Sequence, residues 1–310
     1  MEVEIKALAP FVGIPTFIRA QHTKELKGVN MVIIGNPFDC GVVNRSGARF
    51  GPRAIREQSL LVYSFGNLYP WDYDLRKKFK IIDYGDINVD RFSIGSTLAM
   101  MESLEVESSK VFDAGAALLT LGGDHTTPYG SMRAAAKKYG KLSIIHIDAH
   151  QDAITTGEDH YFHGSFAWDL VKEGVIDDTT SAQIYMRTIY PPECGLGYNI
   201  FYAIEALEMG SEILAAKVRD IVGDNPVYIT FDIDSLDPAC APGTGTPVFG
   251  GPSVYEVRKL LLNLKGINVI AADVVELLPQ YDAHNQISAI AATTIAIDLL
   301  YLMAEKPSSS

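Results

Sequence analysis

Acidic and imidazole side chains follow four of the strands that the sequence predicts. They lie in GGDH at residues 122–125, in DAHQD at 148–152, in DID at 232–234 and in a glutamate at position 276. In an open parallel sheet, a ligand binds outside the carboxyl ends of the strands. The four segments are therefore expected to meet at one edge of a sheet and to form a polar site there.

Four aspartates and two histidines of these segments have the spacing of a metal centre. Alternate residues of a strand point to the same side, which groups Asp148 with His150 and Asp232 with Asp234. Aspartates this close need counter-charge, because like charges raise each other's pKa. Two divalent cations supply it, and carboxylates with a few imidazoles suit Mn²⁺ or a neighbouring first-row ion. The candidate ligands are His125, Asp148, His150, Asp152, Asp232 and Asp234.

Purely structural roles are the alternative for each of these residues. An aspartate at a strand end often caps the next helix, and a histidine there can be a packed core residue. Such roles are reasonable for one of the six but a poor explanation of all six together. Outside the set, His146 is interpreted either as support for the ligands or as a core residue. Asp124 is expected to accept a hydrogen bond from the ring of His125.

The elements that must position these side chains follow an alternating pattern. Short β-branched runs alternate with longer amphipathic segments from about residue 29 onward, which is typical of βαβ units. Strands are expected at 29–35, 79–83, 117–121, 142–148, 183–187, 227–232 and 267–274. Helices are expected at 52–59, 94–115, 129–139, 165–173, 203–222, 253–264 and 288–304. The fold class is therefore predicted to be α/β, a single-domain three-layer α/β/α structure with a mostly parallel central sheet.

This single domain is expected to span residues 29–306, preceded by an N-terminal arm at 1–28 and followed by a frayed tail at 307–310. Glycine and proline are concentrated at 36–52 and 238–252, and loops of this length inside a compact domain are usually functional. Neither GxGxxG nor GxxxxGK occurs, so these glycines do not indicate a nucleotide site.

Composition and charge exclude several classes of partner. The net charge of -12, without a stripe rich in lysine and arginine, argues against a nucleic acid. The acidic surface either keeps the protein soluble or attracts a cationic substrate. Polar residues interrupt the longest apolar stretch, 287–304, so no membrane span is predicted. The N-terminus lacks the basic and apolar regions of a signal peptide, which indicates a cytoplasmic protein.

The motifs GGDH, DAHQD and FDIDSLDPACAPGTGTP resemble those of the ureohydrolase family, which comprises arginases, agmatinases and related guanidino-acid amidinohydrolases. NRSGARFGPRAIR at 44–56 resembles the N-terminal loop of that family, and DVVELLP at 273–279 resembles a further segment. The resemblance covers nearly the whole chain and implies the arginase-like fold. The agmatinase branch fits better than arginase, because the last metal motif reads SLDPACAPGTGTP at 235–247. Ile154 stands where arginases have an asparagine that binds the α-carboxylate of arginine, which also argues against arginase.

The resemblance also implies roles for individual residues. One ion would be bound by the residues at 125, 148, 152 and 232, and the other by those at 148, 150, 232 and 234. The ions would be two Mn²⁺, with Ni²⁺ as an alternative, and would lower the pKa of water to supply a hydroxide nucleophile. Glu276 would bind the guanidinium nitrogens, and Asp152 would carry the proton to the leaving amine. His163 would shuttle protons to solvent, with His160 as its rival; Gly164 after His163 favours the former.

The sequence therefore predicts a hydrolase that splits a guanidino compound into urea and an amine, most readily a small cationic, agmatine-like substrate. Alternatives are a guanidino acid such as 4-guanidinobutyrate or 3-guanidinopropionate, guanidine or a biguanide. The family also implies a homo-oligomer, either a trimer or a hexamer. A metal-binding subunit that assembles with a paralogue, and a related deacetylase, are the rival classes. Gln151 and Ala153 depart from the family around Asp152, and aromatic residues at 161, 162, 166, 168 and 63–71 could form either core or a wall for a cation.

Overall fold

The protein is described by a computed structural model, which covers residues 8–64, 66–89, 95–155, 160–189 and 195–306. Within these ranges, nine strands form one sheet in the order β1-β3-β2-β4-β9-β8-β5-β6-β7, and every neighbouring pair is parallel. The strands are β1 (Gln21–His22), β2 (Met31–Asn36), β3 (Ile81–Asp86), β4 (Ala117–Gly122), β5 (Ser143–Ile147), β6 (Ala182–Met186), β7 (Asn199–Tyr202), β8 (Val227–Asp232) and β9 (Val269–Val275).

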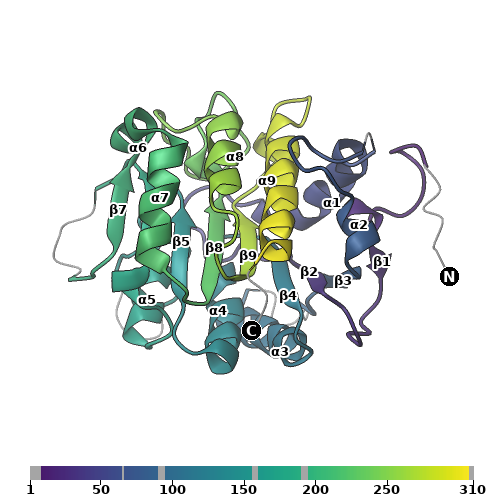
Figure 1. Cartoon of the computed structure of the whole chain (residues 1–310), viewed down its shortest axis with the longest axis horizontal. Helices are drawn as coiled ribbons and strands as arrows, with labels where there is room; N and C mark the ends of the chain where they lie inside the picture. Colours follow the sequence, from purple (N-terminus) through teal and green to yellow (C-terminus); the bar gives the residue numbers. More distant parts are fainter. Residues whose placement is uncertain (1–7, 65, 90–94, 156–159, 190–194, 307–310) are drawn as a thin grey trace.

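Helices cover both faces of the sheet and complete three layers (Figure 1). The first face carries α1 (Gly51–Val62), α2 (Leu75–Lys78), α6 (Ala203–Met209), α7 (Ser211–Val222), α8 (Val254–Asn263) and α9 (Ile287–Ala304). The other face carries α3 (Thr97–Asp113), α4 (Thr127–Tyr139) and α5 (Phe166–Lys172). The predicted fold class is thus confirmed.

Alternate residues of the central strands divide the core into two parts. Ile33 and Leu119 pack into the core beneath α1 and α7–α9, whereas Val32 and Leu118 pack into the core beneath α3–α5. A parallel strand covered on both faces consists of a nearly continuous apolar run, as these strands do. The residues of β4, β8 and β9 are all buried. The polar strand ends described below therefore project from a rigid, dry support.

The prediction located seven of these strands and most helices, but not every boundary. It missed the short edge strands β1 and β7 and the single-turn helix α2. The helix expected at 203–222 is interrupted at Gly210, whose φ of 79° ends α6 and begins α7. The helix expected from residue 94 begins after Ser96, whose side chain caps it; residue 94 itself lies outside the described residues.

The N-terminal segment packs onto the domain where the structure describes it. Phe17 and Ile18 are buried, and their amides donate to the Asp83 carboxylate and to the Ser59 hydroxyl, both at 2.8 Å. Strand β1 then adds an edge to the sheet beside β3. The predicted tail at 307–310, like residues 1–7 of the predicted arm, lies outside the described residues.

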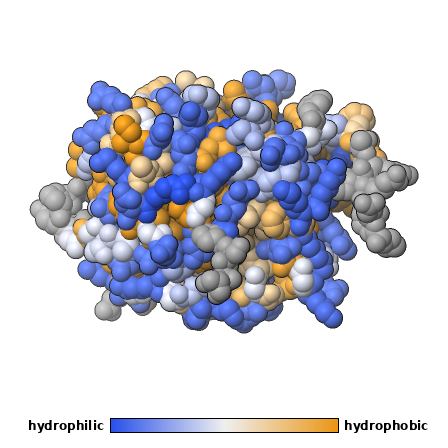
Figure 2. All heavy atoms as spheres, viewed as in Figure 1, coloured by the Kyte–Doolittle hydropathy of each residue, from blue (hydrophilic) through white to orange (hydrophobic). Residues whose placement is uncertain are grey.

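Helix α9 is long and apolar enough to cross a membrane by length and composition, but 78% of it is buried inside the protein. Its Asp298 carboxylate accepts hydrogen bonds from Trp71 Nε1 and Arg258 Nε, both at 2.7 Å. The molecular face on which α7, α8 and α9 lie is mostly hydrophilic, with hydrophobic side chains in separate patches (Figure 2). The helix is therefore a core element of the domain.

Candidate metal centre

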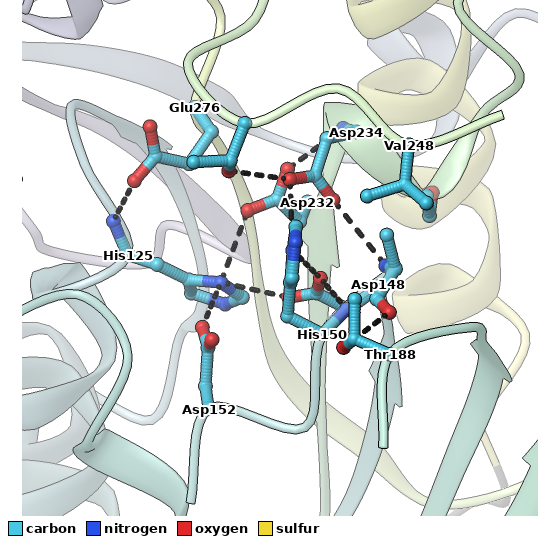
Figure 3. Close-up of polar contacts among 12 residues, drawn as sticks. His125, Asp148, His150, Asp152, Thr188, Asp232, Asp234, Val248 and Glu276 are labelled. Atoms are coloured by element: carbon cyan, nitrogen blue, oxygen red, sulfur yellow. Dashed lines mark hydrogen bonds and ion pairs between the residues drawn. The ribbon is translucent and has the colours of Figure 1, made fainter. Parts of the chain in front are cut away.

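Four neighbouring strands bring the predicted site residues to one edge of the sheet. Strands β4, β9, β8 and β5 lie next to one another, although they are far apart in the sequence. His125 follows β4, Glu276 follows β9, Asp232 ends β8 and Asp148 follows β5. Their side chains converge from these strand ends (Figure 3). Parallel strands present their carboxyl ends on the same edge, which is why residues from distant segments meet there.

The His125 ring stands at the centre of three carboxylates. Its Nδ1 atom lies 3.1 Å from Asp148 Oδ2, 3.0 Å from Asp152 Oδ2 and 3.2 Å from Asp232 Oδ2. The ring is completely buried and packs against Phe166, with ring centroids 4.6 Å apart. Three acidic oxygens therefore surround one nitrogen in an environment without bulk water.

Hydrogen bonds on the far side of the ring decide where its proton lies. His125 Nε2 is 2.8 Å from Thr230 Oγ1, and that hydroxyl donates its own hydrogen to Asp273 Oδ1 at 2.7 Å. Having donated, the hydroxyl accepts from Nε2, so the neutral ring carries its proton on Nε2. The lone pair of Nδ1 then faces the three carboxylates, and no described residue forms a hydrogen bond with Nδ1.

This arrangement of one nitrogen and three carboxylate oxygens fits a cation. Four electron-rich atoms point at one buried place, and only a positive charge makes their approach favourable. Burial lowers the pKa of His125, but the three nearby carboxylates of Asp148, Asp152 and Asp232 outweigh burial and raise that pKa well above its usual value. A proton therefore binds there when no metal does, and a metal ion competes for the same place.

A second group of candidate metal ligands adjoins the group around His125 and shares Asp148 with it. His150 Nδ1 lies 3.1 Å from Asp234 Oδ2 and 3.4 Å from Asp148 Oδ1. The Asp232 side chain accepts from the Asp234 amide at 2.7 Å, and Thr246 Oγ1 donates to Asp234 Oδ2 at 3.0 Å. Asp148, His150 and Asp234 offer ligand atoms close enough for one ion.

His146 lies beside this centre, contacts Asp148 and is completely buried. The Gln183 amide nitrogen donates to Gln151 O at 2.7 Å and is 3.1 Å from His146 Nδ1. That contact leaves the ring proton on Nε2, which lies 2.8 Å from Asp148 Oδ2. The ring is near enough to the His125 group to be a ligand itself, but its hydrogen bonds make it a donor that orients Asp148.

The carboxylates of the centre are held against unfavourable burial and mutual repulsion. Burial raises the pKa of Asp232, and the charges of Asp234 and Asp148 raise it further. Burial also raises the pKa of Asp234. Asp148 behaves differently: burial opposes its charge, but contacts with His146, His125 and His150 hold its pKa well below the usual value. The site therefore needs positive charge to keep all its carboxylates ionised.

Glu276 lies beside the centre with one oxygen engaged and one free. Its Oε1 accepts from the His125 amide and is also 2.9 Å from His163 Nδ1. Its Oε2 is buried and has no hydrogen-bond partner within the described ranges. A buried carboxylate oxygen without a partner is costly. This oxygen is consequently suited to accept hydrogen bonds from a cationic group that enters the site.

Two site residues have a left-handed backbone, Asp152 with φ of 46° and Glu276 with φ of 60°. Such conformations cost about 1–3 kcal/mol for a residue other than glycine and are found preferentially at functional sites. Backbone hydrogen bonds hold both residues: Ala167 N donates to Asp152 O at 3.0 Å, and Glu276 N donates to Gly123 O at 2.8 Å. The fold thus enforces the orientation of both carboxylates.

His163 lies between Glu276 and the loop at residues 36–52, called here the glycine-rich loop. The amide of Val43 donates to its Nε2 at 3.2 Å, and its own amide donates to Gly41 O at 3.0 Å. Burial lowers the pKa of the ring, but the hydrogen bond to Glu276 outweighs it and raises the pKa to about 9. Glu276 therefore favours the protonated ring, whereas the Val43 amide favours the neutral one.

The expectation for Asp124 was wrong. Its carboxylate does not accept from the His125 ring, because Thr230 occupies that position. Asp124 Oδ2 instead accepts from the Gly41 amide at 2.8 Å, and Oδ1 accepts from the Thr126 amide at 3.0 Å. The Gly41 carbonyl in turn accepts from the amide of His163. Asp124 therefore fixes the loop segment that contacts His163.

The predicted aromatic wall is divided between different places. Tyr161 and Phe162 line a cavity of about 600 Å³, together with Val43, Ser96, Thr97, Leu98 and His160. Phe166 contributes to the core around His125, and Trp71 stacks on Tyr301 beneath α9. Of these four residues, Tyr161 and Phe162 are the ones that line a cavity.

Thr230 and Gln183 are functional partners that the sequence analysis missed. Thr230 precedes Asp232 by one strand period on β8, and it pairs in register with Asp273 on β9. Alternation along β8 could have indicated this residue, in the way that it indicated His146 on β5. Gln183 pairs in register with His146 across β5 and β6, a neighbourhood that depends on strand order.

Comparisons with known proteins agree with this geometry. Residues 29–301 match the model of the arginase family. The chain is 42% identical over 275 residues to the agmatinase of Serratia proteamaculans (strain 568), covering 89% of this chain and 88% of that protein. It is similar in structure to a hypothetical agmatinase from Burkholderia thailandensis, with a TM-score of 0.89, 41% identity and coverage of 94% and 91%. It is also similar to proclavaminate amidino hydrolase from Streptomyces clavuligerus, with a TM-score of 0.88, 36% identity and coverage of 96% and 99%.

Proposed function

The chain belongs to the arginase family, and from this premise we propose that it hydrolyses agmatine to urea and a diamine at a centre of two metal ions. The observation that carries the proposal is the Nδ1 atom of His125, which lies 3.0–3.2 Å from three carboxylate oxygens and has no hydrogen-bond partner in the part of the chain that the structure describes. A cation resolves this arrangement, and the family relationship identifies the reaction as C–N bond hydrolysis in a guanidino compound.

Two ions would share the centre. His125, Asp148, Asp152 and Asp232 would hold one ion, and Asp148, His150, Asp232 and Asp234 would hold the other. Mn²⁺ is the proposed metal, because carboxylate oxygens outnumber imidazoles, and Ni²⁺ is the alternative. When bound, such ions lower the pKa of water and supply hydroxide at neutral pH.

The side chains around the ions would bind the substrate and move its protons. Glu276 Oε2 has no hydrogen-bond partner among the residues that the structure describes, so it would accept hydrogen bonds from the guanidinium nitrogens and hold the carbon in place. Asp152 would take the proton that the attacking water loses and pass it to the nitrogen of the breaking C–N bond. His163 would exchange a proton with solvent through Nε2 once the Val43 amide releases that atom.

A guanidino acid is the second candidate substrate, because the cavity lined by Tyr161 and Phe162 shows no group among its described residues that suits the distal amine of agmatine. Val43, Leu98, Tyr161 and Phe162 give this cavity a largely apolar lining, and none of its described lining residues is a carboxylate that would bind the distal amine of agmatine. The similarity to an amidino hydrolase named for proclavaminate also fits such a substrate. Guanidine and biguanides are smaller alternatives that require less of this space.

Urea release by the full chain tests the proposal. The protein would be loaded with Mn²⁺ or Ni²⁺ and assayed with agmatine, 4-guanidinobutyrate, 3-guanidinopropionate, arginine, guanidine and a biguanide. Agmatine should give the highest kcat/KM, whereas a higher value for either guanidino acid would favour the second candidate. Two bound ions without urea from any compound would contradict the enzymatic function and favour a subunit that assembles with a paralogue.

Further parts of the proposal concern the whole protein. Residues 29–306 would form the hydrolase domain, with 1–28 as an arm and 307–310 as a tail. The protein would be cytoplasmic and would form a homo-oligomer, either a trimer or a hexamer. Sedimentation of the full chain measures that state directly.

A further inference from the structure

Arg187, shortly after β6, donates hydrogen bonds to backbone carbonyls of the segment that carries Asp234. Its Nη2 donates to Asp234 O at 2.6 Å and to Leu236 O at 3.2 Å, and its Nη1 donates to Ser235 O at 3.0 Å. Its Nε donates to Val248 O at 3.0 Å, in the loop that follows. One guanidinium thus holds the turn after β8 against the loop at residues 238–252.

The partners of this cation are unusual for a half-buried arginine. Among the residues that the structure describes, Arg187 forms no ion pair with a carboxylate, and its side chain donates hydrogen bonds to backbone carbonyl oxygens. The planar guanidinium has five donors in a fixed fork, which lysine cannot reproduce. Its geometry is therefore used to join two backbone segments.

The backbone of the same segment holds the other ligand-bearing strand end. The amides of Arg187 and Thr188 donate to Ala149 O at 2.9 and 3.2 Å, and the Thr188 hydroxyl donates to the same oxygen at 3.1 Å. Ala149 lies between Asp148 and His150. Figure 3 shows Thr188 beside Asp148 and Val248 beside Asp234, on either side of His150.

Residues 187–188 thereby connect the two backbone segments that carry the second group of candidate ligands, namely Asp148 and His150 on one segment and Asp234 on the other. The distance of 3.1 Å between His150 Nδ1 and Asp234 Oδ2 spans these segments, and the Ala149 amide lies 3.3 Å from Asp234 Oδ1. The His125 group does not depend on this connection in the same way, because His125 follows β4 and Asp152 is held by Ala167.

We propose that Arg187 is a positioning residue that sets the affinity for one of the two metal ions, the one bound by Asp148, His150, Asp232 and Asp234. The inference rests on the proposed two-metal function and adds a residue to it. Partners that orient metal ligands typically change metal affinity by about 10- to 100-fold when they are removed. Arg187 acts through the backbone of the ligands, so its loss should weaken one ion selectively.

Metal titration of the full chain tests this inference. Metal-free wild type and Arg187→Met would be titrated with Mn²⁺ in competition with a chelator, and bound Mn²⁺ would be counted. We expect two ions in both proteins at saturation, with one of the two affinities about 10- to 100-fold lower in Arg187→Met. Arg187→Lys should show the same selective loss, because it keeps the charge but not the fork.

Arg219 provides the matched control. Its Nε donates to Asn263 O at 2.9 Å, and its Nη2 donates to the same carbonyl at 2.6 Å, far from the centre. Arg219→Met removes a similar set of carbonyl contacts and should leave both Mn²⁺ affinities unchanged. Equal affinities in Arg187→Met and wild type, or an equal loss of both ions, would overturn the inference, as would full recovery in Arg187→Lys.

A second variant keeps the test decisive if Arg187→Met does not fold. A Cβ at Gly251 would lie 2.8 Å from Arg187 Nη2 and 2.6 Å from Ser235 O, so Gly251→Ala disturbs the same contacts while Arg187 remains. It should also weaken one ion selectively, and unchanged affinities would overturn the inference. A wild type that binds two ions but releases no urea would contradict the proposed function and leave this result intact.

Discussion

At the scale of single residues, the centre depends on partners that fix the position of a proton. Thr230 accepts from His125 because its own hydrogen is already donated to Asp273, and Gln183 keeps the His146 proton on the nitrogen that faces Asp148. Each imidazole is therefore presented in one tautomer. His125 presents a lone pair to the centre, whereas His146 donates a hydrogen bond to Asp148, a proposed metal ligand.

Asp232→Ala should remove both metal ions and the urea-releasing activity together. Asp232 belongs to both proposed ligand sets, lies 3.2 Å from His125 Nδ1 and also accepts from the Asp234 amide. Metal content after dialysis and urea release measure the two effects. Asp113→Ala is the control, because Asp113 is an exposed aspartate at the end of α3 and should keep both ions. Two ions retained in Asp232→Ala would contradict the ligand assignment.

His163→Asn should lower kcat by about 10²- to 10⁴-fold, the usual contribution of a proton-transferring group. Metal content should not change, because His163 contacts Glu276 and Val43 rather than a proposed ligand. Urea release and bound metal would be measured on the same sample. His284→Asn changes an exposed histidine and should keep the wild-type rate. An unchanged rate in His163→Asn would transfer the role to His160 or to solvent.

Residue types and strand periodicity were enough to predict that the six candidate ligands would lie close together, because alternate residues at strand ends share a side. The structure brings these six together. The partners of Asp124 could not be predicted in this way, because its hydrogen bond goes to Gly41, far away in the sequence. Nor could a sequence pattern indicate that Asp152 and Glu276 would have positive φ, since tertiary contacts enforce that conformation.

At the scale of elements, a buried ion pair joins α1 to β3 and to the N-terminal segment. Arg56 Nε and Nη2 donate to the two oxygens of Asp83 at 2.8 and 3.0 Å, and Asp83 also accepts from the Phe17 amide. Burial lowers the pKa of Arg56, but the charges of Asp83 and Asp86 outweigh it and raise that pKa. The glycine-rich loop leads directly into α1, so this pair anchors one end of that loop.

Asp83→Asn should reduce the free energy of unfolding by about 3 kcal/mol, the lower end of the effect of removing one partner from a buried ion pair. Asp86, which also contacts Arg56, limits the loss. Chemical denaturation measures it. Glu57→Gln breaks the exposed pair with Arg53 and should cost less than about 0.5 kcal/mol. Equal stability of Asp83→Asn and wild type would contradict a structural role for the pair.

The elements differ in how well the sequence predicts them. Central strands such as β4 and β8 are apolar runs buried on both faces, and their pattern is unambiguous. Edge strands β1 and β7 are short and partly exposed, so their pattern does not differ from that of a loop. Strand order was not predictable from periodicity either, because it depends on how the crossovers pack, and strand order is what brings Thr230 next to Asp273.

At the scale of the whole molecule, the centre is a local concentration of negative charge in a protein whose net charge is already -12. Burial raises the pKa of Asp232 and Asp234, and their mutual repulsion raises it further in the former. The metal-free fold therefore contains carboxylates that are more stable when exposed to water. Metal ions that bind only the folded chain should offset this cost.

Removal of the metal should accordingly lower Tm, and its return should restore it. A ligand present at about 100 times its Kd stabilises the folded state by about 2.7 kcal/mol per site, so two ions contribute about 5 kcal/mol and raise Tm by several degrees. Scanning calorimetry of the full chain with and without a chelator measures the shift. Asp232→Ala should show no shift, because it has lost both proposed sites, whereas Asp113→Ala should respond as wild type does. A wild-type Tm that is unchanged after verified metal removal would mean that the carboxylates are compensated within the protein itself, and the cation would then be dispensable for the fold.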